Sequence, residues 1–171
     1  PPVLPSDVDY LLMECTYGDQ VHGSVMDAYE KFKELMIRNA RQRGKVIIPA
    51  FAVGRTQEVV FFLNQLISDN IIPPIPVYVD SPLAVEASKI FRSYPEYFDE
   101  ETRQFIREER HPALDFKGLT YVSSVEESKK LNDMDGPMVI ISASGMAETG
   151  RILHHLKNNI ENPRNTVLIV G

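Results

Sequence analysis

Short apolar runs alternate along the chain with longer segments in which apolar residues recur every three or four positions. Runs such as Val46-Ile47-Ile48 have the length and composition of buried strands, and the longer segments have the spacing of amphipathic helices. Strands are expected at Val8–Met13, Lys45–Phe51, Ile75–Val79, Leu119–Val122, Met138–Ser142 and Thr166–Val170. Helices are expected at Val21–Arg43, Arg55–Ser68, Ala84–Tyr94, Glu96–Glu109, Val125–Leu131 and Gly150–Asn159, with Gly44 as the C-cap of the first.

The alternation of strands and helices predicts an α/β fold. We expect a three-layer, doubly wound, mainly parallel sheet of about six strands, with helices on both faces. The length of 171 residues fits a single domain over residues 1–171. In open sheets of this kind, ligands bind beyond the carboxyl ends of the strands, so the strand-to-helix turns are the place to look for a site.

Composition and charge exclude some classes of protein and make others less favoured. The single cysteine, Cys15, excludes an internal disulfide and fits a reducing, cytoplasmic setting. The sequence has neither an apolar run long enough for a membrane helix nor the pattern of a signal peptide. The net charge of −6 argues against an autonomous nucleic-acid binder, because non-specific affinity for phosphates is largely electrostatic.

Four strand-to-helix turns combine small, hydroxylic and basic residues. Free backbone N–H groups at helix N-termini suit anions such as phosphate, and glycine lets the backbone approach a ligand closely. Arg55 and Arg151 add guanidinium groups that can fork onto a phosphate. Together the turns predict a groove for a polyanion. The four turns are Glu14–Asp19, Pro49–Glu58, Asp80–Ala84 and Ser142–Met146, the last of which is followed by Gly150, Arg151, His154 and His155.

Each turn also has a purely structural interpretation. Ser81 and Pro82 fit the N-cap and N1 positions of an ordinary helix. Glu14 either caps the following turn or serves a function, and His22 either pairs with it or lies on the first helix. His154 and His155 are adjacent and therefore point in different directions on a helix, so the pair is a weak metal signal.

In sequence and order, these four turns resemble the signature turns of the β-CASP nucleases, a branch of the metallo-β-lactamase superfamily that includes ribonuclease J. The resemblance covers essentially the whole chain and is strongest to the bacterial, ribonuclease-like group. In that family the β-CASP segment is inserted into a metallo-β-lactamase domain, and the zinc-binding HxHxDH motif is absent from this sequence. The resemblance therefore implies a domain excised from a longer protein, in which two zinc ions activate water for attack on a phosphodiester.

The resemblance also assigns roles to individual residues. Glu14 matches the acid that orients a zinc-ligand histidine in intact relatives. Arg55, Ser81, Ser144, Gly145 and Arg151 are expected to line the RNA path, and either His154 or His155 to reach a phosphate. The expected partners are RNA, with DNA as an alternative, and the lactamase domain of the same chain; this fragment is expected to bind no metal and to be inactive alone. The face that packs on the lactamase half would be partly apolar and would favour self-association.

Two other function classes stay open at this stage. A free-standing nucleotide- or phosphate-binding α/β domain would fit the fold, although Thr16-Tyr17-Gly18-Asp19 does not supply the GxGxxG expected after the first strand of a dinucleotide fold. A structural or docking module would fit the acidic charge.

Overall fold

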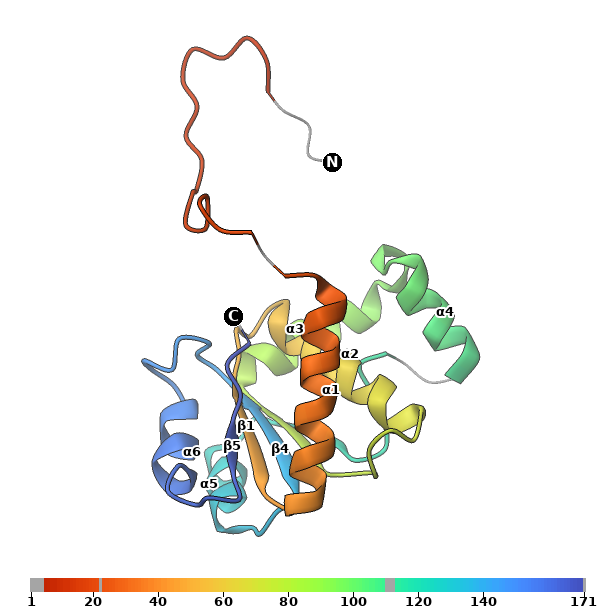
Figure 1. Ribbon diagram of the computed structural model, residues 1–171, viewed down its shortest axis with the longest axis vertical. Coiled ribbons are helices and arrows are strands. Elements are labelled where there is room, and N and C mark those ends of the chain that lie inside the picture. The colour runs from red at the N-terminus through yellow and green to blue at the C-terminus, as the bar shows by residue number, and fades with distance from the viewer. Residues whose placement is uncertain (1–4, 22, 110–112, 171) are drawn as a thin grey trace.

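The computed structural model describes residues 5–21, 23–109 and 113–170. Its centre is a five-stranded parallel sheet in the order β3-β2-β4-β1-β5. The strands are β1 (Lys45–Pro49), β2 (Val77–Asp80), β3 (Leu119–Val122), β4 (Met138–Ser142) and β5 (Thr166–Val167). The predicted α/β class with a parallel sheet is confirmed (Figure 1).

The two central strands are buried along their whole length. Every residue of β1 and β4 is buried, and the register pairs Ile47 with Ile140 and Pro49 with Ser142. Helices cover both faces of such strands, so their sequences read as continuous apolar runs and not as alternating ones. This explains why the runs Val46-Ile47-Ile48 and Val139-Ile140-Ile141 predict buried strands from the sequence.

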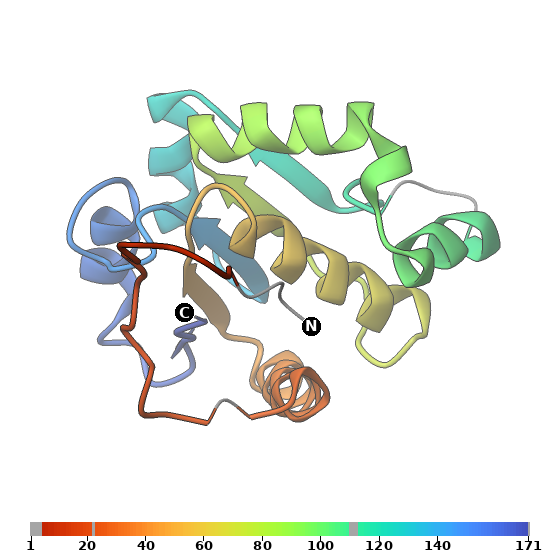
Figure 2. The ribbon, with the colours of Figure 1, turned by 90° about the horizontal axis from the view of Figure 1, so that it is seen from above.

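Helices cover the sheet on both faces (Figure 2). The helices are α1 (Val25–Gln42), α2 (Arg55–Ser68), α3 (Pro82–Ser93), the 3₁₀ helix η1 (Pro95–Tyr97), α4 (Glu100–Glu109), α5 (Val125–Asp133) and α6 (Ile152–Asn159). Because side chains alternate along a strand, Val139 and Ile141 of β4 pack in the large core with α1, α2 and α3. Met138 and Ile140 point to the other face and form a smaller core with Leu131 of α5.

Helices α1, α3 and α5 begin at a serine cap. The Oγ atoms of Ser24, Ser81 and Ser124 accept hydrogen bonds from backbone N–H groups three residues later. Ser24 explains why α1 begins at Val25 and not at Val21 as predicted. Pro82 occupies the first turn of α3, where its missing N–H costs nothing, so this helix begins two residues before the predicted Ala84.

The end of α1 differs from the prediction that Gly44 is its C-cap. Arg43, at φ 55°, takes the left-handed conformation that ends the helix. Gly44 is needed for a different reason. A Cβ on Gly44 would lie 1.7 Å from the carbonyl oxygen of Arg164, so the backbone passes too close there for any side chain.

The predicted strand Val8–Met13 is wrong. Residues 5–21 form no strand and extend away from the body of the molecule (Figure 1). Tyr10 and Leu12 are 90% and 93% exposed. An apolar run becomes a strand only where another strand can satisfy its backbone hydrogen bonds, and the described part of the chain provides no such partner for this segment. Self-association through the face that would pack on the lactamase domain stays a prediction.

Other element boundaries shift by a few residues. The segment Glu96–Glu109 divides into η1 and α4, and the last strand ends at Val167 instead of Val170. Arg55–Ser68, Leu119–Val122 and Met138–Ser142 have the predicted bounds. Within the described ranges, none of the helices combines the length and the apolar character required to span a bilayer.

Candidate functional site

Three of the four predicted turns lie side by side at one edge of the sheet. Strands β2, β4 and β1 are neighbours and run parallel, and the register aligns their last residues Asp80, Ser142 and Pro49. The turns that lead into α3, α6 and α2 therefore emerge together (Figure 2). The fourth predicted turn, Glu14–Asp19, is on the extended N-terminal segment and follows no strand.

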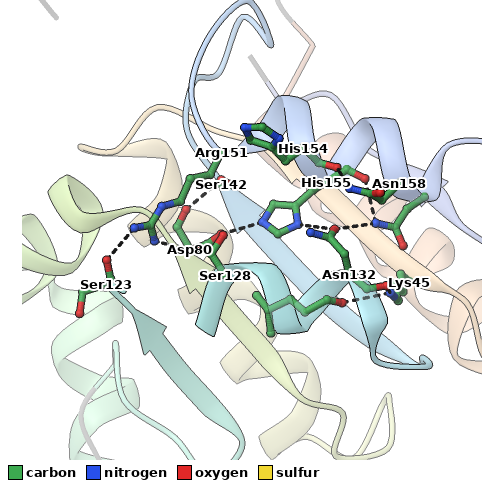
Figure 3. Close-up of polar contacts among 12 residues, drawn as sticks. Lys45, Asp80, Ser123, Ser128, Asn132, Ser142, Arg151, His154, His155 and Asn158 are labelled. Atoms are coloured by element: carbon green, nitrogen blue, oxygen red, sulfur yellow. Dashed lines mark hydrogen bonds and ion pairs between the residues drawn. The ribbon is translucent and has the colours of Figure 1, made fainter. Parts of the chain in front are cut away.

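A fully buried carboxylate organises this edge. Asp80 accepts hydrogen bonds at Oδ2 from Ser128 Oγ (2.5 Å) and from His155 Nε2 (2.6 Å). Its Oδ1 accepts a charge-assisted bond from Arg151 Nη1 at 2.7 Å. The backbone oxygen of Asp80 accepts a further bond from Ser142 Oγ at 2.8 Å. One residue at the end of β2 thus joins β4, α5 and the start of α6 (Figure 3).

Strand periodicity explains where the Asp80 side chain points. Val77 and Val79 belong to the large core, whereas Tyr78 packs against the smaller core on the α5–α6 face. Asp80 is two residues after Tyr78 and so faces the same way, toward Ser128 and His155.

The Asp80 carboxyl group is stabilised in its charged form. Burial acts to raise its pKa, but the hydrogen bonds from His155, Ser128 and Arg151 outweigh that effect and hold the pKa of Asp80 below its ordinary value. An ionised carboxylate only accepts hydrogen bonds, so the Nε2 atom of His155 carries the shared proton.

Asparagines fix the other side of the His155 ring. Nδ1 lies 3.0 Å from Oδ1 of Asn132. Asn159 Nδ2 donates to that same oxygen and to the backbone oxygen of His155, which sets the orientation of both amides. The two amides therefore hold the His155 ring in the orientation that points Nε2 at the Asp80 carboxylate.

Arg151 is anchored but not enclosed. Its Nη1 donates to Asp80 and its Nη2 donates to the backbone oxygen of Ser123 at 2.6 Å. The side chain remains 20% exposed. A guanidinium has five N–H groups, so the two bonds hold its direction and leave donors for a ligand at the edge of the sheet.

The two candidate histidines have different environments. His155 has 0% exposure, and both ring nitrogens have partners inside the protein. His154 is exposed, and Figure 3 shows its ring pointing away from Asp80. Helix spacing predicts which histidine is buried. His155 lies three residues after Ile152 and four before Asn159, so it shares a helix face with these two buried residues.

The remaining candidates occupy more ordinary positions. Ser81 is buried, and its Oγ caps α3 by accepting from the Ala84 N–H at 3.3 Å. Arg55 pairs with Glu58 at 2.5 Å. It lines a cavity of about 320 Å³ between α1, α2 and residues 168–170, on the α2 side of the sheet, whereas Arg151 faces α5 and α6.

Ser144 and Gly145 form the turn after β4. The Ser144 N–H donates to the backbone oxygen of Thr149 at 3.2 Å, and the Ser144 oxygen accepts from the Ala147 N–H at 3.1 Å. The turn thus folds back on itself before α6 begins. Gly145 contacts the ring of Phe51 in the neighbouring turn.

Glu14 is exposed and far from this network. Its Oε2 accepts a hydrogen bond from the Thr16 N–H at 2.9 Å, and that bond lowers the pKa of Glu14. His22, the suggested partner of Glu14, lies outside the described residues. Among the residues that the structure describes, no three histidine, cysteine, aspartate or glutamate side chains form a group that could hold a metal ion. The described residues of this chain therefore do not fit a zinc site.

The residue at the centre of the hydrogen-bond network is not among the predicted site residues. Asp80 lies in one of the four predicted turns, but the sequence assigns no site role to it or to its partners Ser128 and Asn132. The sequence does contain a usable indication of this network. Asp80 ends a buried strand, and a buried acid requires cationic or hydroxyl partners.

Comparison with known proteins supports the resemblance noted in the sequence. Residues 56–171 match the Beta-Casp domain family. This chain belongs to that family. The Beta-Casp chain is 39% identical over 170 residues to ribonuclease TTHA0252 of Thermus thermophilus, and the match covers 99% of this chain.

Relatives in archaea and eukaryotes are similar over nearly the same length. Transcription termination factor FttA of Methanosarcina mazei is 35% identical over 167 residues, which is 96% of this chain. Endoribonuclease ysh1 of Schizosaccharomyces pombe is 30% identical over 170 residues, or 99% of this chain. The Beta-Casp chain corresponds to 39%, 26% and 22% of the lengths of these three relatives.

Proposed function

We propose that this Beta-Casp chain is the RNA-binding part of a zinc-dependent ribonuclease, and that it holds the sugar–phosphate backbone at the carboxyl edge of its sheet. The observation that carries the proposal is Arg151, a partly exposed guanidinium fixed by Asp80 beside three converging strand-end turns. A fixed fork of N–H donors suits a phosphate, because the side chain loses little conformational freedom when it binds. The names of relatives, two of them ribonucleases, point to RNA as the ligand.

Local charge supports this proposal in spite of the net charge of −6. The Asp80 carboxylate is fully buried, whereas the Arg151 guanidinium that it pairs with is 20% exposed. A ligand at this edge therefore meets the cation and not the carboxylate. A positive centre at an edge lined by turns attracts phosphate there, while the acidic remainder of the surface repels RNA from other faces.

Individual residues take different roles in this proposal. Arg151 binds a phosphate directly, and the exposed His154 lies next to it on α6. Ser144 and Gly145 shape the adjacent turn. Arg55 is available to a second phosphate, because its exposed pair with Glu58 is worth little and can exchange. Ser81 and His155 act from inside by holding α3 and the Asp80 network.

The catalytic metal belongs to the longer protein in this proposal. Zinc would activate the water that attacks the phosphodiester, and its ligands would lie outside the described residues of this chain. Glu14 would support one of those ligands once the extended segment packs against the lactamase domain. The isolated chain is then expected to bind RNA weakly and to cut none.

The test is RNA binding by the whole chain, measured by fluorescence anisotropy over a range of salt concentrations. Arg151→Ala should weaken binding and reduce the slope of log K against log salt by about 0.7, the value for one phosphate contact on a single strand. Lys157→Ala is the matched control, since Lys157 is an exposed cation on the same helix. Equal effects of the two substitutions would contradict the proposed site.

Two further measurements test the choice of RNA as the ligand and the expected lack of activity. A DNA strand of the same sequence compares the two nucleic acids, and tighter binding of DNA would remove RNA as the preferred ligand. Incubation of labelled RNA with the chain and added zinc should leave the RNA intact. Stoichiometric, tight zinc binding or zinc-dependent cleavage by this chain would contradict its assignment as the inactive part.

A further inference from the structure

Large apolar side chains are exposed along the carboxyl edge of the sheet, next to the polar groups of the proposed phosphate site. Leu83 follows β2, Met146 follows β4, and Phe51 and Val53 follow β1. Since these strands are neighbours in the order β2-β4-β1, the four side chains follow the edge in that order.

The backbone of Phe51 is held by the start of α2. Its backbone oxygen accepts hydrogen bonds from both the N–H and the Oγ1 of Thr56, at 3.2 and 2.8 Å. Its neighbours Ala50 and Ala52 are buried, yet Phe51 is 51% exposed. Phe51 is therefore a partly exposed aromatic residue on a fixed backbone.

Gly145 supports the ring from the turn after β4. A Cβ on Gly145 would lie 2.9 Å from Cδ2, 3.0 Å from Cε2 and 3.0 Å from the backbone nitrogen of Phe51, which is closer than nearly all real Cβ atoms approach another atom. The ring thus packs directly on the backbone of Gly145, and a side chain at that position would displace it. Arg151 lies six residues further along the same connection, at the start of α6.

We propose that Phe51 is a stacking platform for a nucleobase of the bound RNA. The inference rests on the proposed phosphate binding and adds a contact between the protein and a base. Aromatic rings bind nucleic acids by stacking on the face of a base, largely without regard to sequence.

Gly145 takes a supporting part in this arrangement. Its role is to let Phe51 pack close against the turn, in addition to any contact of its own with RNA. Gly145→Ala is therefore expected to act through Phe51 and to weaken binding to bases, while binding to the phosphate backbone persists.

The experiment compares two ligands of the same length and charge: a short oligouridylate and its abasic counterpart, which has the phosphates and sugars but no bases. Anisotropy at one fixed, low salt concentration is measured for the whole chain and for Phe51→Leu, Phe51→Tyr and Val53→Ala. Leucine keeps an apolar side chain without a π face, tyrosine keeps the ring, and Val53 is an exposed apolar neighbour. Circular dichroism and thermal unfolding establish that each variant is folded.

We expect the wild-type chain to bind oligouridylate about tenfold more tightly than the abasic strand. Phe51→Leu should remove that difference, and Phe51→Tyr and Val53→Ala should retain it. Equal binding of the two strands by the wild type, or equal affinities of the leucine and tyrosine variants for oligouridylate, would overturn the stacking platform while phosphate binding stands. Binding of neither strand would overturn the proposed function itself.

Discussion

Asp80 and Arg151, 71 positions apart in sequence, form an ion pair in which Nη1 of Arg151 lies 2.7 Å from Oδ1 of Asp80. The carboxylate is fully buried, whereas the guanidinium reaches the surface. The pair connects the inside of the sheet with the edge where three strand-to-helix turns converge. Its geometry makes Asp80 the positioning residue for Arg151.

Asp80→Asn is expected to destabilise the chain strongly. The substitution leaves the Arg151 cation without its buried counter-charge, and removing one partner of a buried ion pair costs about 3–5 kcal/mol. Urea unfolding measures the change in free energy. Glu58→Gln, which breaks the exposed pair with Arg55, should cost at most about 1 kcal/mol. Similar costs for the two variants would show that the Asp80 network is not a centre of stability.

Acid should weaken the protein partly through Asp80. Because hydrogen bonds from His155, Ser128 and Arg151 outweigh burial and lower the pKa of Asp80, its contribution to stability is complete above the unfolded-state pKa of about 3.9. That contribution is lost as the pH falls through the lower pKa of the folded state. Asp80→Asn has no such group, so its unfolding free energy should fall less steeply than that of the wild type below about pH 4. Parallel curves for the two proteins would contradict the lowered pKa.

His155 should carry a proton on Nε2, because that atom lies 2.6 Å from Oδ2 of the Asp80 carboxylate, which can only accept a hydrogen bond. Nitrogen-15 NMR shows which ring nitrogen bears a proton, and His154→Gln removes the neighbouring signal for assignment. A His155 ring without a proton on Nε2 would contradict the hydrogen bond to Asp80.

Gly44→Ala should destabilise the chain by about 2–3 kcal/mol, because its new Cβ would overlap the carbonyl oxygen of Arg164 and force the backbone to move. Gly23→Ala provides the control, since no atom lies within 4 Å of a Cβ built there. That change should stay within about 0.5 kcal/mol. If thermal unfolding gives equal results for both, the close approach at Gly44 is not a structural constraint.

The sequence predicted the elements whose signal is local. Arg55–Ser68 and Met138–Ser142 show continuous helical or strand patterns, and their bounds are those of the structure. The Val8–Met13 run has the same local pattern as a buried strand, but whether a partner strand exists is not a local property. The segment is consequently exposed within the described chain.

The site was predictable only in outline. Three turns could be placed at one edge, because the carboxyl ends of parallel strands lie together. Which side chains form hydrogen bonds with one another at that edge could not be predicted from the sequence. Asp80 and His155 are 75 residues apart and meet only because α6 packs on the sheet. The spacing of residues on α6 could have predicted that His155 is buried, because Ile152, His155 and Asn159 share the buried face of that helix.

The most direct test of the account is the location of RNA on the folded chain. Amide chemical-shift changes can be followed by NMR while a short single-stranded RNA is added. The account predicts that the largest changes fall on the turns after β1, β2 and β4, including Phe51, Ser144 and Arg151, and that residues at the opposite edge such as Lys45 and Asn165 change little. Changes centred on the opposite edge or on α4, with the strand-end turns unaffected, would contradict it.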